Sequence, residues 1–270
     1  METKLNIGIV GCGTIGSRLS CAINQEIPEL NLKAVCDTQS EKAEKLASSL
    51  LPQPAVLDIT KLIAAVDLVV ECAAKEVVGA LVAETLEQGK EIMVLSSSGL
   101  IGREDLFALA FKRKRRIYIP SGALAGLDGV KSASVGKITS ATLTIRKHPH
   151  GLEGAPYVVK NRINLGAVRK EMLIFTGNVA QAVAGFPQNV NVAATLSLVS
   201  LGPEETVVKI IVNPKLKRNV HEMEVIGEFG RIYSSTENFL SPDNPRTSYL
   251  AVFSAIATLK SIVSVVKVGT

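Results

Sequence analysis

The sequence of 270 residues has only four cysteines, three histidines and no long apolar run. No pair among the cysteines has CxxC spacing, which argues against a disulfide framework and a zinc site. They are Cys12, Cys21, Cys36 and Cys72. Unpaired cysteines suit the reducing cytoplasm, where we expect this protein. Charged residues or glycine interrupt every apolar stretch well short of a membrane span, and the first residues do not resemble a signal peptide. We therefore expect neither a metal nor a membrane partner.

Charge of either sign is also modest, because 30 Lys and Arg against 25 Asp and Glu give a formal net charge of +5. This mild excess favours anionic small molecules. The one dense basic run, Lys112–Arg116, falls at the end of a predicted helix, where cations are favourable. No aromatic residue interleaves it to stack on bases. We expect no nucleic-acid partner.

The first half of the chain alternates short apolar runs with segments of helical spacing. The apolar runs predict strands at Leu5–Val10, Leu32–Cys36, Leu68–Cys72, Ile92–Leu95 and Ile117–Ile119. The helical spacing predicts helices at Thr14–Asn24, Ser40–Leu50, Val77–Gln88 and Glu104–Lys114. This alternation predicts an α/β fold with a doubly wound parallel sheet, a Rossmann domain, over residues 1–122.

The second half has a different pattern, in which apolar and polar residues alternate. This pattern predicts strands at Ala141–Arg146, Val207–Val212, Glu222–Ile226 and Arg231–Ser235, with helices at Asn178–Ala184 and Val192–Val199. We expect a second, smaller α/β domain over residues 123–245, built on a mixed or antiparallel sheet. We expect Lys147–Lys160 to be a mobile loop. The long apolar helix Ser248–Val266, within residues 246–270, should pack back on the first domain.

A complete GxGxxG motif, Gly11–Gly16, directly follows the first predicted strand and opens a helix. This context is typical of dinucleotide binding. Gly11 permits the tight turn, Gly13 lets the backbone approach a pyrophosphate, and Gly16 lets the helix lie close to the strand. The helix N-terminus, at Thr14 and Ile15, supplies N–H groups to the phosphates.

Other candidate cofactor contacts follow the later strands. Asp37 ends the second strand, where a carboxylate hydrogen-bonds the adenosine ribose; this favours NAD over NADP, although Asp37 could also be a simple turn residue. Ala73 and Ala74 are small enough for the cofactor to pass. Ser97 follows the next strand, and we place the nicotinamide side of the site near it and near the segment Pro120–Gly129. NADP stays open as the alternative.

Together with this fingerprint, several loop motifs make the chain resemble the L-aspartate dehydrogenase family over essentially its whole length. The motifs are Val70–Ala74, Pro120–Asp128, Phe186–Thr195, Asn219–His221 and Ser241–Ser248. The resemblance implies a Rossmann domain, a smaller dimer-forming α/β domain, and NAD(P)-dependent oxidation of L-aspartate. The product would be iminoaspartate, which feeds NAD synthesis or hydrolyses to oxaloacetate and ammonia.

The same resemblance implies particular site residues. It implies a catalytic role for His221, a cofactor contact from Ala123 or Ala125, and another from Asn189 or Asn191. We favour Ala125 and Asn191, with both pairs left open. From the residues alone, histidine suits a step that needs a group titrating near neutrality, yet His221 could equally be a surface residue at a strand end.

A dicarboxylate substrate needs cations or N–H donors for both carboxylates. Candidate cations are Lys160, Arg162, Arg169, Lys170, Lys215 and Arg218, and candidate neutral donors are Ser121, Asn191 and Asn219. The sequence does not choose among them. Two other functions stay open: a related homoserine dehydrogenase or dihydrodipicolinate reductase, and a non-catalytic NAD sensor.

Overall fold

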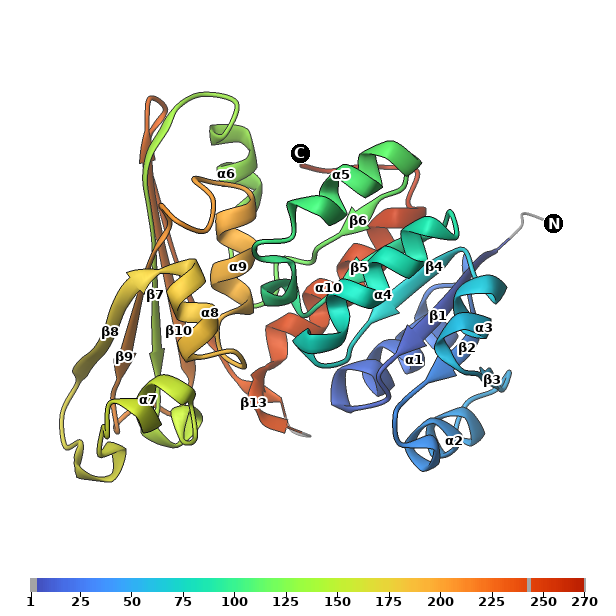
Figure 1. The fold of residues 1–270 in the computed structure, drawn as a ribbon, viewed down its shortest axis with the longest axis horizontal. Coiled ribbons are helices and arrows are strands. Elements are labelled where there is room, and N and C mark those ends of the chain that lie inside the picture. Colours follow the sequence, from blue (N-terminus) through green and yellow to red (C-terminus); the bar gives the residue numbers. More distant parts are fainter. Residues whose placement is uncertain (1–3, 242–243, 270) are drawn as a thin grey trace. The chain divides into compact units, whose positions relative to one another are not determined.

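The structure, a computed structural model, describes residues 4–241 and 244–269 of the chain. The chain forms two compact units (Figure 1). The first comprises Met1–Pro120 and Val252–Lys267, and the second comprises Ser121–Ala251 and Val268–Thr270. Each unit has its own sheet.

The first unit is built on a six-stranded parallel sheet with the order β3-β2-β1-β4-β5-β6. Its strands are β1 (Leu5–Val10), β2 (Leu30–Cys36), β3 (Ala55–Val56), β4 (Leu68–Glu71), β5 (Glu91–Val94) and β6 (Ile117–Tyr118). The order reverses at β1, which is the topology of a Rossmann fold. The predicted doubly wound parallel sheet is confirmed.

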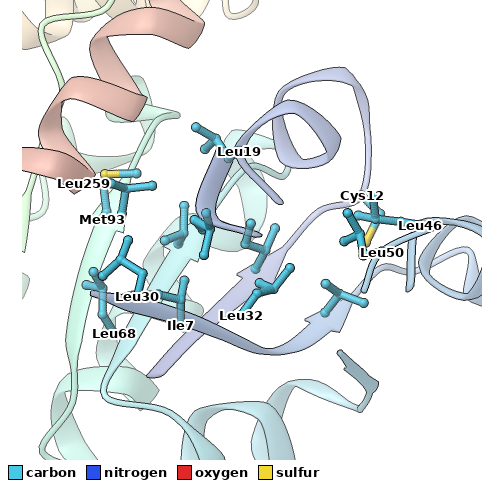
Figure 2. Close-up of a cluster of buried hydrophobic side chains, with 14 of the residues drawn as sticks. Ile7, Cys12, Leu19, Leu30, Leu32, Leu46, Leu50, Leu68, Met93 and Leu259 are labelled. Carbon is cyan, nitrogen blue, oxygen red and sulfur yellow. The ribbon is translucent and has the colours of Figure 1, made fainter. Parts of the chain in front are cut away.

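Helices cover both faces of this sheet because β1 and β4 bury side chains on both sides. They are α1 (Thr14–Glu26), α2 (Ser40–Ser48), α3 (Ile59–Ala65), α4 (Lys75–Glu87), α5 (Glu104–Arg113) and α10 (Tyr249–Val263). One core cluster joins Ile7 and Leu68 to Leu19 of α1 and Leu259 of α10. Figure 2 shows Leu259 beside Met93 of β5 in this cluster. A second cluster holds the side chains of α3, α4 and α5 on the other face.

The second unit is built on a five-stranded mixed sheet with the order β11-β10-β7-β9-β8. Its strands are β7 (Ile138–Lys147), β8 (Met172–Asn178), β9 (Val207–Val212), β10 (Asn219–Gly227) and β11 (Gly230–Asn238). Only the β7–β9 pair is parallel among the pairs of this sheet. The mixed sheet is therefore also confirmed.

One face of the second sheet is buried beneath helices. Burial alternates along β7 and β10, so that odd-numbered side chains such as Leu143, Ile145 and Met223 face the core. The helices are α6 (Leu127–Ala133), α8 (Val179–Gly185) and α9 (Asn191–Leu198), and α8 and α9 lie against the sheet in Figure 1. This period of two decides which polar side chains of the strands face inward.

The segment Lys147–Lys160, which we expected to be a mobile loop, has regular structure. It contains a 3-10 turn, η2 (Pro149–Leu152), and a short helix, α7 (Pro156–Lys160). Lys147, Leu152 and Val158 are buried. The prolines and glycines that suggested a loop instead start the two helical segments and separate them.

The motif Ser241–Ser248 lies partly outside the described residues, at 242–243. On either side of them, β12 (Leu240–Ser241) pairs with β13 (Asn244–Ser248). Within the described ranges, no helix is both long enough and apolar enough to cross a bilayer.

Candidate functional site

The glycine motif forms a turn between β1 and α1 that tolerates no side chain at two of its three glycines. Gly11 has φ +102°, and a Cβ there would lie 2.5 Å from the carbonyl oxygen of Cys72. A Cβ on Gly16 would lie 1.9 Å from the carbonyl oxygen of Gly11. These two glycines hold α1 against the end of the sheet.

Gly13 differs, because a Cβ built on it would meet nothing within 4 Å. Gly13 is the N-cap of α1, whose first turn, Thr14 and Ile15 included, carries neither a side-chain cap nor an acidic residue. A helix N-terminus with uncapped N–H groups attracts anions. The open space at Gly13 and the uncapped helix together fit a dinucleotide pyrophosphate.

Asp37 lies at the end of β2 and organises the same turn. Its Oδ2 accepts a hydrogen bond of 2.7 Å from the backbone N–H of Cys12, and its Oδ1 accepts one of 2.9 Å from Gln39. The carboxylate therefore fixes the backbone between Gly11 and Gly13. Carboxylate oxygens can accept further bonds, so this role leaves room for a ribose hydroxyl.

Glu71, at the end of β4, supports the loops that carry Ala73, Ala74 and Ser97. Its buried carboxylate accepts hydrogen bonds from the backbone N–H groups of Ala73, Leu95 and Ser96, at 2.7, 3.1 and 2.9 Å. Burial raises the pKa of Glu71, while these N–H donors oppose the rise. The sequence analysis did not assign this role to Glu71.

Ala73 and Ser97 occupy neighbouring strand ends as predicted, and the two loops are linked by a hydrogen bond of 2.9 Å from Ser96 Oγ to the Ala73 carbonyl. Ala74 is the N-cap of α4, and Ser97 begins the buried 3-10 turn η1 (Ser97–Leu100). In the first unit, the predicted cofactor residues thus gather at the carboxyl edge of the parallel sheet, where ligands bind in this fold.

The second unit holds a separate polar cluster around His221. This residue lies inside β10, on the buried face, with a fractional exposure of 4%. It is not a surface residue at a strand end. Its Nδ1 lies 3.1 Å from the carbonyl oxygen of Ala123, which also accepts a hydrogen bond of 2.9 Å from Thr236 Oγ1. Asn238 Nδ2 donates to Thr236 Oγ1 at 3.0 Å.

Nδ1 of His221 lies 3.1 Å from the Ala123 carbonyl oxygen, which can only accept, and 3.3 Å from the Asn238 amide nitrogen, which can only donate. The shorter contact, with the carbonyl, is satisfied when Nδ1 carries the proton. Nε2 then carries the lone pair and is the nitrogen that can take up a proton. Burial and the positive charge of Lys147 lower the pKa of His221 from 6.5 to about 4, so the ring is neutral at pH 7.

Lys147 is another residue of the site that the sequence analysis missed. It is 5% exposed, and its Nζ donates a hydrogen bond of 2.6 Å to Asn189 Oδ1. Burial lowers its pKa from 10.5 to about 8. The sequence contained a signal for its burial, because Lys147 follows Leu143 and Ile145 at the spacing of two residues that places side chains on the same, inward face of a strand.

The members of the two open pairs have different surroundings in the structure. Ala123 and Asn189 contact His221 and Lys147, respectively. Ala125 is exposed, and its carbonyl accepts from Ser234 Oγ at 2.8 Å. Asn191 begins α9. The six candidate cations of the sequence analysis are all exposed.

Two family models match the chain. Residues 128–262 match the model described as aspartate dehydrogenase, C-terminal, and residues 11–120 match the NAD-binding domain of homoserine dehydrogenase. The division between the two matches falls in the segment that joins β6 to α6.

Curated relatives match over nearly the whole chain. An L-aspartate dehydrogenase of Methanosarcina mazei is 48% identical over 98% of this chain and 100% of its own length. One of Bradyrhizobium diazoefficiens is 38% identical over 100% of this chain and 95% of its own length. A crystal structure of aspartate dehydrogenase from Thermotoga maritima is 25% identical, with a TM-score of 0.77, and covers 98% of this chain and 99% of that one.

Proposed function

This chain belongs to the aspartate dehydrogenase family, and from that premise we propose that it catalyses the NAD(P)-dependent oxidation of L-aspartate to iminoaspartate, with His221 as the proton acceptor. The observation that carries the assignment of His221 is its buried ring, whose Nδ1 lies within hydrogen-bond distance of the Ala123 carbonyl, a contact that favours a lone pair on Nε2. An unprotonated Nε2 can accept the proton that an amine must lose before it can be oxidised.

The residues of the second unit supply the proton chemistry. The substrate ammonium group must become a neutral amine, because its nitrogen lone pair drives the loss of hydride from the α-carbon. Nε2 of His221 accepts that proton, while the Ala123 carbonyl stabilises the Nδ1–H of the resulting imidazolium. A bound nicotinamide supplies the hydride acceptor. Once His221 has released that proton to solvent, it can deprotonate a water molecule if the imine is hydrolysed.

The first unit supplies the cofactor site. We assign the pyrophosphate to Gly11, Gly13 and the N-terminus of α1, and the adenosine ribose to Asp37. A carboxylate at this position repels a 2′-phosphate, which supports NAD as the preferred cofactor. The resemblance implies a cofactor contact from Ala123 or Ala125 and another from Asn189 or Asn191; we favour Ala125 and Asn191, with both pairs left open.

Further proposals rest on the family rather than on geometry. They are a dinucleotide-binding domain at 1–122 joined by the C-terminal helix, a substrate and dimerisation domain at 123–245, and a homodimer in the cytoplasm. Iminoaspartate either feeds NAD biosynthesis or hydrolyses to oxaloacetate and ammonia.

The test follows the absorbance of reduced nicotinamide while the purified protein receives L-aspartate with NAD or NADP. L-homoserine, L-glutamate and D-aspartate are tested in parallel. We expect turnover with L-aspartate alone and a loss of 10²- to 10⁴-fold, an order-of-magnitude range, in His221→Ala. His150→Ala is the matched control, because His150 is an exposed histidine on η2. Cofactor binding without turnover of any amino acid would reject the enzyme assignment in favour of a sensor.

A further inference from the structure

Lys147, the last residue of β7, is a buried cation for which the described part of the chain provides no carboxylate. Its ammonium group donates to the neutral Oδ1 of Asn189. The ion pairs between described residues all involve other cations. Burial removes the hydration of an ammonium group, and one amide oxygen replaces only part of it. The positive charge and the remaining N–H donors of Lys147 can therefore bind an anion.

This cation lies beside His221 on the same face of the same sheet. Ile145 is the register partner of His221, and Lys147 follows Ile145 by two residues in the inward phase of β7. The electrostatic influence of Lys147 on His221, described above, is consistent with this proximity. Any ligand that reaches Nε2 of His221 therefore comes within range of the Lys147 charge.

We propose that Lys147 forms an ion pair with one carboxylate of the dicarboxylate substrate and so positions the amino group for His221. This proposal rests on the proposed function, since it names a substrate ligand for the same reaction. A buried charge pair contributes more to binding than an exposed one, because water screens the exposed pair. The exposed cations of the sequence analysis are weaker candidates for that reason.

Substrate binding then changes the basicity of His221. Among the described neighbours of its ring, Ala123, Thr236 and Asn238 are neutral, and Lys147 is the charged group that acts on it. Next to Lys147 in the chain, Arg146 forms ion pairs with Glu171 and Glu222. On the other side, His148 stacks on His150, which contacts Glu153. A carboxylate bound to Lys147 offsets its positive charge. The proton affinity of His221 rises when the substrate is in place.

The kinetic test replaces Lys147 by methionine, which keeps the length of the side chain and removes the charge. We expect Lys147→Met to raise KM for L-aspartate on the order of 100-fold, because it removes one partner of a buried charge pair. Lys147→Arg keeps the cation and should restore part of the affinity. Lys209→Met is the matched control, since Lys209 lies exposed on the neighbouring strand β9. The KM for the cofactor serves as a check and should change little.

The binding test uses succinate, a dicarboxylate without an amino group, titrated calorimetrically in the presence of saturating NAD. The unmodified protein and His221→Ala should bind succinate, and Lys147→Met should not. Loss of kcat in Lys147→Met with unchanged KM and unchanged succinate binding would overturn the proposal and make Lys147 the proton acceptor. Unchanged KM and kcat would also overturn it.

The two proposals fail in different ways. Turnover of L-aspartate that is equal in the unmodified protein and in Lys147→Met would reject the role of Lys147 and keep the enzyme assignment. Binding of succinate that depends on Lys147, without turnover of L-aspartate, would reject the proposed reaction and keep the anion site. Misfolding is checked by the thermal midpoint, which should not fall in Lys147→Met, because the variant removes a desolvated charge.

Discussion

Nδ1 of His221, a residue of β10, lies 3.1 Å from the carbonyl oxygen of Ala123, which precedes α6 in the chain by only a few residues. The contact joins residues 98 positions apart. It favours the tautomer with the proton on Nδ1, and Thr236 and Asn238 keep the carbonyl in place through their own hydrogen bonds. The chemistry of the site therefore depends on the backbone of the glycine-rich segment after β6 as much as on the histidine.

Replacing Asn238 by aspartate tests this arrangement. Asn238 Nδ2 lies 3.3 Å from Nδ1 of His221, so the variant places a negative charge beside the ring. A nearby carboxylate favours the imidazolium and raises the pKa of His221. Protonated His221 cannot act as a base, so activity should disappear at a higher pH than in the unmodified protein. We expect the acid limb of the pH profile of kcat/KM to move upward by about one to two pH units.

The control for that experiment is Asn238→Leu, which removes the same hydrogen bonds without adding charge. It should lower kcat and leave the acid limb far less displaced. An acid limb that moves equally in both variants would show that the shift comes from lost packing rather than from charge.

The depressed pKa of His221 also makes stability depend on pH. Its pKa is about 4 in the folded chain and 6.5 ordinarily, so the unfolded chain binds the proton more readily. The effect of His221 on the unfolding free energy is constant above pH 6.5. As the pH falls from 6.5 to 4, the unfolded chain takes up the proton first and the unfolding free energy decreases. One pKa unit corresponds to about 1.4 kcal/mol, which gives a loss of about 3 kcal/mol in total. Urea unfolding at pH 7.5 and pH 4.5 should show a smaller loss in His221→Gln, which cannot take up the proton. Equal losses in both proteins would contradict the assignment.

Replacing two glycines of the same motif by alanine should affect different properties: Gly16→Ala should lower stability, and Gly13→Ala should weaken cofactor binding. Gly16→Ala places a Cβ within 1.9 Å of the Gly11 carbonyl oxygen, so we expect a loss of about 3 kcal/mol or more in unfolding free energy. Gly13→Ala places its Cβ in open space, so stability should stay within about 0.5 kcal/mol. The same Cβ would occupy the space of the pyrophosphate, and the cofactor KM should rise about tenfold or more, which corresponds to about 1.4 kcal/mol. Thermal unfolding with and without NAD, combined with steady-state kinetics, separates the two effects. A Gly13→Ala protein with unchanged cofactor KM would place the pyrophosphate elsewhere.

The sequence predicted the first sheet well because parallel strands buried on both faces appear as continuous apolar runs, as in Leu68–Glu71. The two-residue strand Ala55–Val56 was missed because it is exposed and too short to show a pattern. The segment after Lys147 was misjudged because proline and glycine occur both in loops and at the starts of helical turns. The alternation along β7 indicates that Lys147 faces inward, but local sequence does not reveal its partner Asn189, which is 42 residues away. Contacts of this length arise from sheet register and helix packing, which no local pattern specifies.

Asp37 should determine the choice between NAD and NADP. Its Oδ2 accepts the N–H of Cys12, so a test must separate its charge from its structural role. Asp37→Asn removes the charge and retains an oxygen acceptor for the turn, and it should lower the preference for NAD over NADP about tenfold, an energy of about 1.4 kcal/mol. Adding Thr38→Arg to that variant supplies a partner for the 2′-phosphate and should reverse the preference. Asp37→Ala removes both the charge and the acceptor, so it should weaken the binding of both cofactors. The measurement is the ratio of kcat/KM for NAD to that for NADP, with L-aspartate saturating. An unchanged ratio in Asp37→Asn would assign Asp37 to the turn alone and leave the cofactor preference to other residues.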